Sequence, residues 1–365
     1  MYSKLKVLLL LAEFPFWRAA RHLSYSAQLG VEDGLRATGV RCVTITSPWL
    51  PRALGLFRKH TFDQVWVVAR LDVFDETSIG RIAELAPVRL AMLADSLEYS
   101  PEEYFLSPTL KSRRVEKRLE VMTHVLACDE KDVETIYERH GIPALWWPQA
   151  VPERFISDDV PSPTRDAAVF YGASYGLRRE WLRHPDLKGI LVHPRSPESG
   201  TIYPLLFNAL HLPLTRPFHF LAPVRERAVT AYLSQLRRLR ERSFAGWLKA
   251  LQTGRGVVNL PHLVKTYAGR VVEGMAAGRP VISWEIPGRP QNKALFENER
   301  EILLFSTDDL SQLVSQLTRL LSDRHLSHQI VVNARKKLRY LHTSEIRARQ
   351  ILCWVINGRM PNYWS

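Results

Sequence analysis

Residues 256–285 read GVVNLPHLVKTYAGRVVEGMAAGRPVISWE, and this segment is the most informative part of the sequence. Its apolar runs at 257–260 and 281–284 predict two buried strands, and the segment between them, 267–277, has the pattern of a short helix. The glycine of segment 278–280 suits the left-handed backbone that follows a helix, and its proline prevents the helix from continuing. A strand, a helix and a second strand in this order form one unit of a parallel sheet.

The same alternation of strands and helices extends over the whole chain. We expect strands at 7–12, 41–46, 65–69, 89–93 and 125–127, and, in the second half, at 167–171, 189–193, 257–260, 281–284 and 302–305. We expect helices at about 24–38, 75–85, 109–122 and 131–140, then from about 177, and at 225–242, 245–252, 267–277, 310–322, 327–341 and 344–357. Apolar strands that alternate with helices form parallel sheets covered on both faces. The predicted fold class is therefore α/β.

Residues 153–166 separate the two halves, because prolines and acidic residues occur there without apolar periodicity. The sequence thus predicts an N-terminal Rossmann-like domain, 1–152, and a C-terminal one, 167–343, that face each other across a cleft. The final segment, 344–365, is expected to be helical and to pack back on the first domain. Such clefts at the carboxyl ends of strands hold ligands.

The composition is that of a globular protein. The 365 residues are 46% hydrophobic and 24% charged, enough for two cores. The three cysteines, Cys42, Cys128 and Cys353, lie far apart, which excludes a disulfide framework or a clustered zinc site and indicates a reducing compartment. The first apolar run, 7–12, is far shorter than the ~20 residues of a membrane span. We expect a cytoplasmic protein.

The net charge of +13, with a pI near 9.8, favours a polyanionic partner. Nucleotide diphosphates, an anionic membrane surface and nucleic acid are the alternatives. The basic helix predicted at 225–242 has an apolar face and a basic back, so it either packs on a core or lies on the inner face of a membrane. Nucleic acid is not expected, since no helix-turn-helix or RNA-binding signature is present.

The start of the predicted helix 267–277 is a candidate anion site. Free amides and a partial positive charge point out of the sheet there, around Thr266, Tyr267 and Gly269. Arg270 and Glu273 are three residues apart and share a helix face. The arginine can reach a phosphate, and the glutamate can accept hydrogen bonds from two ribose hydroxyls.

The segment RVVEGMAAGRPVI, 270–282, resembles the R-x-x-E-x-x-A-x-G-x-P-V-I block of group 1 glycosyltransferases, in particular the branch similar to spore-maturation protein B. Weaker resemblance extends over about 169–355. It implies the GT-B fold and a hexosyl or related transferase that takes its sugar from a nucleotide-diphosphate donor and gives it to an unidentified acceptor. It also implies that Glu273 holds the ribose and that Arg270 contacts the diphosphate.

Lys265 is a departure from this pattern. Retaining members of one such family carry a glutamate eight positions before the ribose glutamate, and here that position is a lysine. The stereochemical outcome therefore stays open, and so does the alternative of a GT-B-shaped nucleotide-binding scaffold without catalysis. A lysine can instead neutralise phosphate charge.

Further site candidates follow the ends of predicted strands. On the donor side they are Ser174, Arg178, His193 and His262, together with Lys265; on the acceptor side they are Asp95 and Glu13, either of which could act as general base. No Asp-x-Asp loop and no His/Cys cluster has ligand spacing. We therefore expect neither a bound metal nor a cofactor, since basic side chains and a helix dipole can stabilise a leaving diphosphate.

Overall fold

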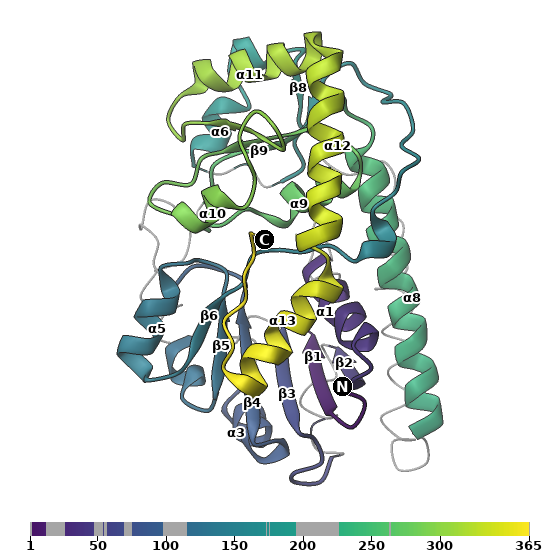
Figure 1. Ribbon diagram of the computed structural model, residues 1–365, viewed down its shortest axis with the longest axis vertical. Helices are drawn as coiled ribbons and strands as arrows, with labels where there is room; N and C mark the ends of the chain where they lie inside the picture. The colour runs from purple at the N-terminus through teal and green to yellow at the C-terminus, as the bar shows by residue number, and fades with distance from the viewer. Residues whose placement is uncertain are drawn as a thin grey trace.

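The computed structural model describes residues 2–11, 26–46, 54, 57–68, 75–97, 115–172, 174, 176–194, 226–262 and 264–364. Two α/β domains lie one above the other in Figure 1, with the N-terminal domain below. Every strand pairing within each of the two named sheets is parallel. The predicted α/β class is confirmed.

The N-terminal sheet has the strand order β2-β1-β3-β4-β5-β6. Its strands are β1 Lys6–Leu11, β2 Arg41–Thr46, β3 Gln64–Val68, β4 Val88–Leu93, β5 His124–Ala127 and β6 Ala144–Trp146. Helices α1 Ser26–Ala37, α3 Glu76–Leu85 and α5 Asp132–His140 accompany them. Along β1, Leu8 and Leu10 enter one core whereas Val7 and Leu9 enter the other. This alternation is the reason that a strand covered on both faces reads as a continuous apolar run. The short strand β6 was not predicted.

The C-terminal sheet has the order β11-β10-β9-β7-β8. Its strands are β7 Ala168–Val169, β8 Leu191–Val192, β9 Val257–Asn259, β10 Val281–Trp284 and β11 Leu303–Phe305. Its helices are α6 Leu177–Trp181, α8 Glu226–Leu251, α9 Gly269–Ala276, α10 Pro290–Ala294, α11 Leu310–Ser322 and α12 Arg324–Leu341, with 3₁₀ turns at Glu153–Phe155 and Pro185–Leu187. In both sheets the first strand of the domain lies between the second and the third, which is the doubly wound order.

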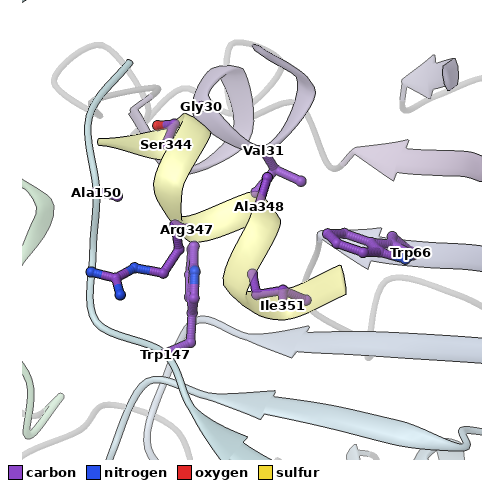
Figure 2. Close-up of a pocket in the computed structure, with 9 residues that line it drawn as sticks. All are labelled: Gly30, Val31, Trp66, Trp147, Ala150, Ser344, Arg347, Ala348 and Ile351. Carbon is purple, nitrogen blue, oxygen red and sulfur yellow. The ribbon is translucent and has the colours of Figure 1, made fainter. Parts of the chain in front are cut away.

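Helix α13, Ser344–Asn357, returns to the N-terminal domain and packs on α1 (Figure 1). Two glycines of α1 allow this approach. A Cβ at Gly34 would lie 2.3 Å from the Ser344 carbonyl oxygen, and a Cβ at Gly30 would meet the hydroxyl of the same serine. Figure 2 shows the small cavity that remains beside this contact, with Trp147 and Arg347 among its lining residues.

Helix α8 is continuous, whereas we expected two helices with a break after residue 242. The residues around the expected break enter the core: Phe244, Trp247 and Leu248 are all buried in the C-terminal domain. Burial of these side chains outweighs the weak local preference for a break. Among the described helices, none is long and apolar enough to span a bilayer.

The basic side of α8 does not face solvent throughout. Arg237 donates to Asp33 of α1 at 2.6 Å, and Arg240 is paired with Glu32 of the same helix. Arg238 and Arg242 are exposed. Arg237 and Arg240 of this helix therefore connect the two domains through ion pairs.

Candidate functional site

The strand order of the C-terminal sheet places its topological switch point between β7 and β9, and we call the region beyond these strand ends the crevice. The chain leaves β7 toward β8 on one side, and β9 continues to β10 on the other. At such a switch point the loops that follow the two strands diverge, and ligands bind between them. The described residues of these loops are 170–172, 174 and 176 after β7, and 260–262 and 264–268 after β9.

Two arginines meet at the Phe170 ring in this crevice. Arg178, from α6, and Arg270, from α9, place their guanidinium carbons 5.2 and 4.9 Å from the ring centroid. Phe170 itself is fully buried. Because the face of an aromatic ring attracts cations, this ring holds two positive charges at the mouth of the crevice.

Main-chain and side-chain acceptors fix both arginines. Arg178 is buried and donates to the carbonyl oxygens of Pro261 at 2.6 Å and Leu260 at 2.9 Å. Arg270 is partly exposed and donates to the Asn259 Oδ1 atom at 3.1 Å. These acceptors are neutral, so they orient the cations without cancelling their charge.

Gly172 is needed where the arginine passes the loop. A Cβ at this position would lie 2.8 Å from Arg270 Nη2 and 2.7 Å from the tip of the Phe170 ring. The Gly172 carbonyl oxygen in turn accepts a hydrogen bond of 2.8 Å from His193 Nε2. The predicted residues His193, Arg178 and Arg270 thus lie together around one loop.

His262 carries an unsatisfied donor at this place. Its Nδ1 atom accepts a hydrogen bond of 3.0 Å from the Val264 amide, so the neutral ring bears its proton on Nε2. That Nε2 atom is buried and has no hydrogen-bond partner among the described residues. Burial, followed by the charges of Arg178, Arg270 and Lys265, lowers the pKa of His262 well below 6.5. A neutral N–H group therefore lies within an electropositive environment.

The beginning of α9 is partly open. Thr266 Oγ1 and the Tyr267 amide both donate to Asn292 Oδ1, at 3.2 and 3.1 Å, and both residues are buried. The next residues, Ala268 and Gly269, are partly exposed. The helix start is thus held from one side by α10, and its first turn still reaches the surface.

Glu273 lies deeper than we expected for a residue that holds a ribose. It is fully buried, and its Oε2 atom accepts a hydrogen bond of 2.9 Å from Trp247 Nε1 of α8. Lys265 is partly buried, with its ammonium nitrogen 5.6 Å from the centroid of the Trp284 ring. The ribose and sugar-side roles of these residues stay predictions.

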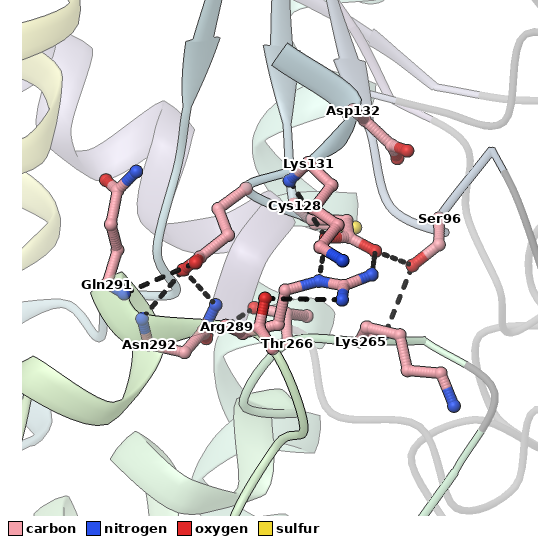
Figure 3. A network of polar contacts seen from close by, with 12 residues as sticks. Ser96, Cys128, Lys131, Asp132, Lys265, Thr266, Arg289, Gln291 and Asn292 are labelled. Carbon is pink, nitrogen blue, oxygen red and sulfur yellow. Dashed lines mark hydrogen bonds and ion pairs between the residues drawn. The ribbon is translucent and has the colours of Figure 1, made fainter. Parts of the chain in front are cut away.

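Polar groups of the N-terminal domain form hydrogen bonds with residues of the C-terminal domain at this site (Figure 3). Ser96, after β4, accepts from the Lys265 amide at 3.0 Å and donates to Asp129 Oδ2 at 2.9 Å. Asp129, after β5, receives two hydrogen bonds from Arg289, at 2.5 and 2.9 Å. Glu130 accepts from the Asn292 amide at 2.9 Å. The carboxyl ends of strands from both sheets therefore meet.

The remaining predicted residues are placed as follows. Asp95 is partly exposed and adjoins Ser96, whose hydroxyl accepts from the Lys265 amide. Ser174 is exposed in the loop after β7. Glu13 lies outside the described residues. Among the residues that the structure describes, no three His, Cys, Asp or Glu side chains are grouped as a metal site.

Several residues of the site were not predicted. They are Phe170, Trp247, Asn259, Asp129 and Arg289. Asn259 and Asp129 share a signal that the sequence does contain: each is a polar residue at the end of an apolar strand, where parallel sheets bind ligands or partners. Trp247 and Arg289 carry no such signal, because only the folded chain brings them to their partners.

Comparisons with known proteins bear on the fold. Residues 215–353 match the family model described as glycosyl transferase-like. A search of curated proteins finds no match. Among solved structures, HepE from Anabaena in complex with UDP and glucose aligns over 95% of this chain and 98% of its own, with a TM-score of 0.55 and 11% identity.

Two further structures are similar over nearly their full length. Sucrose-phosphate synthase from Thermosynechococcus elongatus aligns over 95% of this chain and 97% of its own, with a TM-score of 0.55 and 15% identity. An alpha-glucosyltransferase in complex with UDP and a 13-mer DNA covers 96% and 99%, with a TM-score of 0.56 and 13% identity. Together with the two parallel sheets, these likenesses confirm that the chain has the α/β GT-B fold.

Proposed function

We propose that this protein is a glycosyltransferase that moves a sugar, a hexose or a related one, from a nucleotide-diphosphate donor to an acceptor. One observation carries the proposal: the buried Nε2–H group of His262 lacks an acceptor among the described residues, and it lies among the charges of Arg178, Arg270 and Lys265. A buried donor without a partner is costly, and a phosphate oxygen in the crevice would satisfy it. The match to the glycosyl transferase-like model supports the proposal.

The proposed chemistry is stabilisation of the leaving diphosphate. Negative charge develops on the diphosphate as the bond to the sugar breaks, and donors that are already oriented stabilise it best. Arg178 and Arg270 are held by neutral acceptors, and the first turn of α9 adds main-chain amides. In this proposal the protein's own cations take the place of a metal. Full turnover in the presence of a chelator is the expected result, and loss of turnover would contradict it.

We propose that Glu273 holds the ribose of the donor, as the resemblance to group 1 glycosyltransferases implies; membership of the narrower branch similar to spore-maturation protein B is part of the same proposal. Because Glu273 is buried and bound to Trp247, removal of its side chain would also disturb packing. Glu273→Gln is the better variant, since it keeps the volume and one acceptor oxygen. We expect weaker nucleotide binding with a nearly unchanged melting temperature.

On the acceptor side we propose Asp95 as the general base. It follows β4 on the domain opposite the crevice, next to the Ser96–Lys265 contact. Asp95→Asn should lower kcat about 10²- to 10⁴-fold, the usual contribution of such a group, and leave donor affinity unchanged. An unchanged kcat would return the role to the other candidate, Glu13.

A thermal-shift screen with UDP, GDP, TDP and CMP tests the donor proposal. A ligand at 100 times its Kd adds about 2.7 kcal/mol to stability, enough for a clear shift. Arg270→Ala should reduce the shift, and Lys249→Ala, an exposed cation of α8, is the matched control. A wild-type protein that binds none of the four would contradict the proposal. A protein that binds one of them but hydrolyses no donor sugar would favour the scaffold alternative.

We further propose a cytoplasmic location with peripheral contact to an anionic membrane, through the exposed Arg238 and Arg242 of α8. Liposome co-sedimentation should rise with the content of anionic lipid and fall in Arg238→Ala/Arg242→Ala. Binding that does not depend on lipid charge would remove this part of the proposal.

A further inference from the structure

A chain of hydrogen bonds runs across the carboxyl ends of β9 and β10. Asn259 and Ser283 are opposite each other in the parallel register, and both are fully buried. Arg270 Nη1 donates to Asn259 Oδ1 at 3.1 Å, and Asn259 Nδ2 donates to Ser283 Oγ at 2.9 Å. Ser283 Oγ donates to the Trp284 carbonyl oxygen at 3.2 Å.

This series of hydrogen bonds has only one consistent donor-to-acceptor direction. The serine hydroxyl has a single proton, which it gives to the Trp284 carbonyl, so its oxygen accepts from the asparagine. The NH₂ group of Asn259 must then face Ser283, and its Oδ1 atom must face Arg270. The reverse orientation would place the NH₂ group against a guanidinium, where two donors oppose each other. The amide is therefore locked in the orientation that accepts from the arginine.

The Asn259 side chain is uncharged, and this matters as much as the orientation of its amide. A carboxylate in the same place would also bind Arg270, but it would neutralise the guanidinium that an anionic ligand must meet. An amide oxygen orients the guanidinium and leaves its full charge in place. Phe170 and Gly172 also lie close to this guanidinium.

We infer that Asn259, oriented by Ser283, is a positioning residue that holds the Arg270 guanidinium toward the diphosphate of the donor. This inference rests on the proposed function. Asn259 acts through Arg270 and does not itself bind the ligand. Its effect is therefore confined to ligands that carry the diphosphate charge.

The experiment measures Kd by calorimetry for UDP, UMP and uridine, with inorganic pyrophosphate as a probe that has no base. Asn259→Asp keeps the size of the side chain and adds one negative charge next to Arg270. We expect at least a tenfold loss of affinity for UDP and pyrophosphate, a smaller loss for UMP, and less than a twofold change for uridine. Ser283→Ala frees the Asn259 amide to rotate without adding charge. Its UDP affinity should lie between those of wild type and Asn259→Asp.

Asn333→Asp is the matched control, because Asn333 is a partly exposed residue of α12, where it donates to the Arg300 carbonyl oxygen. A double-mutant cycle separates positioning from independent action: in an Arg270→Ala background, Asn259→Asp should cause no further loss. Additive losses, or equal losses for UDP and uridine, would overturn the inference while the proposed function stands. If wild type binds neither pyrophosphate nor any nucleotide of the thermal-shift screen, the proposed function fails and the inference fails with it. Should Asn259→Asp not fold, unchanged UDP affinity in Ser283→Ala would decide against the inference.

Discussion

Among single residues, the buried histidines show how position controls protonation. His342 is 1% exposed, and its Nδ1 atom accepts a hydrogen bond of 3.0 Å from Arg347. Burial, then the charges of Arg347 and Lys337, lowers its pKa well below 6.5. His262 is neutral for the same kind of reason in the crevice. Both rings are therefore neutral donors and acceptors at pH 7.

These shifts predict acid sensitivity with a definite sign. Below pH 6.5 each histidine binds a proton in the unfolded chain but not in the native one, so the free energy of unfolding falls as the pH falls. The slope approaches about 1.4 kcal/mol per pH unit for each histidine. His342→Asn keeps an acceptor for Arg347 and removes one titrating group, so its urea unfolding between pH 7 and 5 should show a flatter dependence. Equal slopes for wild type and His342→Asn would contradict the lowered pKa of His342.

The sequence revealed those site residues that belong to a local pattern. Arg270 and Gly269 were found because the glycine stop and the following strand define the short helix that carries them. Trp247 could not be found, because its bond to Glu273 joins residues 26 positions apart. Lys265 was found by its position, yet its contact with Trp284 and the contact of its amide with Ser96 depend on two other elements.

At the level of secondary-structure elements, the contact between α1 and α13 depends on glycine. A Cβ at Gly34 would lie 2.3 Å from the Ser344 carbonyl oxygen and 2.7 Å from the Ala348 Cβ. We expect Gly34→Ala to lower the free energy of unfolding by about 1–3 kcal/mol, as overpacking usually does.

Gly80 of α3 gives the control for this substitution. It is exposed in a helix, and a Cβ there meets nothing within 4 Å. Gly80→Ala should raise the free energy of unfolding by about 0.5–1 kcal/mol, because alanine loses less backbone entropy. Denaturant unfolding of both variants checks the opposite signs. A neutral Gly34→Ala would mean that α13 does not approach α1 as closely as described.

Strands and helices with a strong apolar period were predictable, and those decided by tertiary packing were not. The apolar run of β1 is buried on both faces, and its type follows from composition alone. The three-residue strand β6 is set by its pairing with β5, and α8 is continuous because its second half is covered by the C-terminal core. Local signals are too weak at these places to decide the structure.

The ion pairs between α8 and α1 form the most deeply buried charged contact among the described elements. Burial alone would raise the pKa of Glu32, but Arg240, Arg36 and Arg237 outweigh it and lower the pKa. Arg240→Met would leave the Glu32 carboxylate buried without its closest partner, at a cost of about 3–5 kcal/mol. Adding Glu32→Gln to this variant should recover part of the loss.

Chemical unfolding of the single and double variants tests this contact. Lys117→Ala, which removes an exposed ion pair with Glu76, should leave the free energy of unfolding unchanged. If Arg240→Met lowers the free energy of unfolding no more than Lys117→Ala does, the Arg240–Glu32 pair does not contribute to stability.

Across the whole molecule, the two domains touch at separate places. At one place, which we call the rear contact, α8 and α13 pack on α1, and the Tyr363 hydroxyl donates to the Trp146 carbonyl oxygen at 2.6 Å. At the other, which we call the front contact, Arg289 binds both oxygens of Asp129, which is 1% exposed. The first contact joins helices and the chain end, whereas the second is made by a few side chains from loops. Separation of the two domains should therefore break the front contact and bend the molecule about the rear one.

This arrangement predicts the effect of removing Arg289. In Arg289→Ala the Asp129 carboxylate would be buried between the domains without its counter-charge, and it can regain water only if the domains separate. Small-angle X-ray scattering should then show a larger radius of gyration than in wild type. Adding Asp129→Asn removes the charge and should return the radius toward the wild-type value. Lys293→Ala, which breaks a pair with Glu285 inside one domain, should leave the scattering unchanged. Identical curves for wild type and Arg289→Ala would mean that the rear contacts alone fix the angle between the domains.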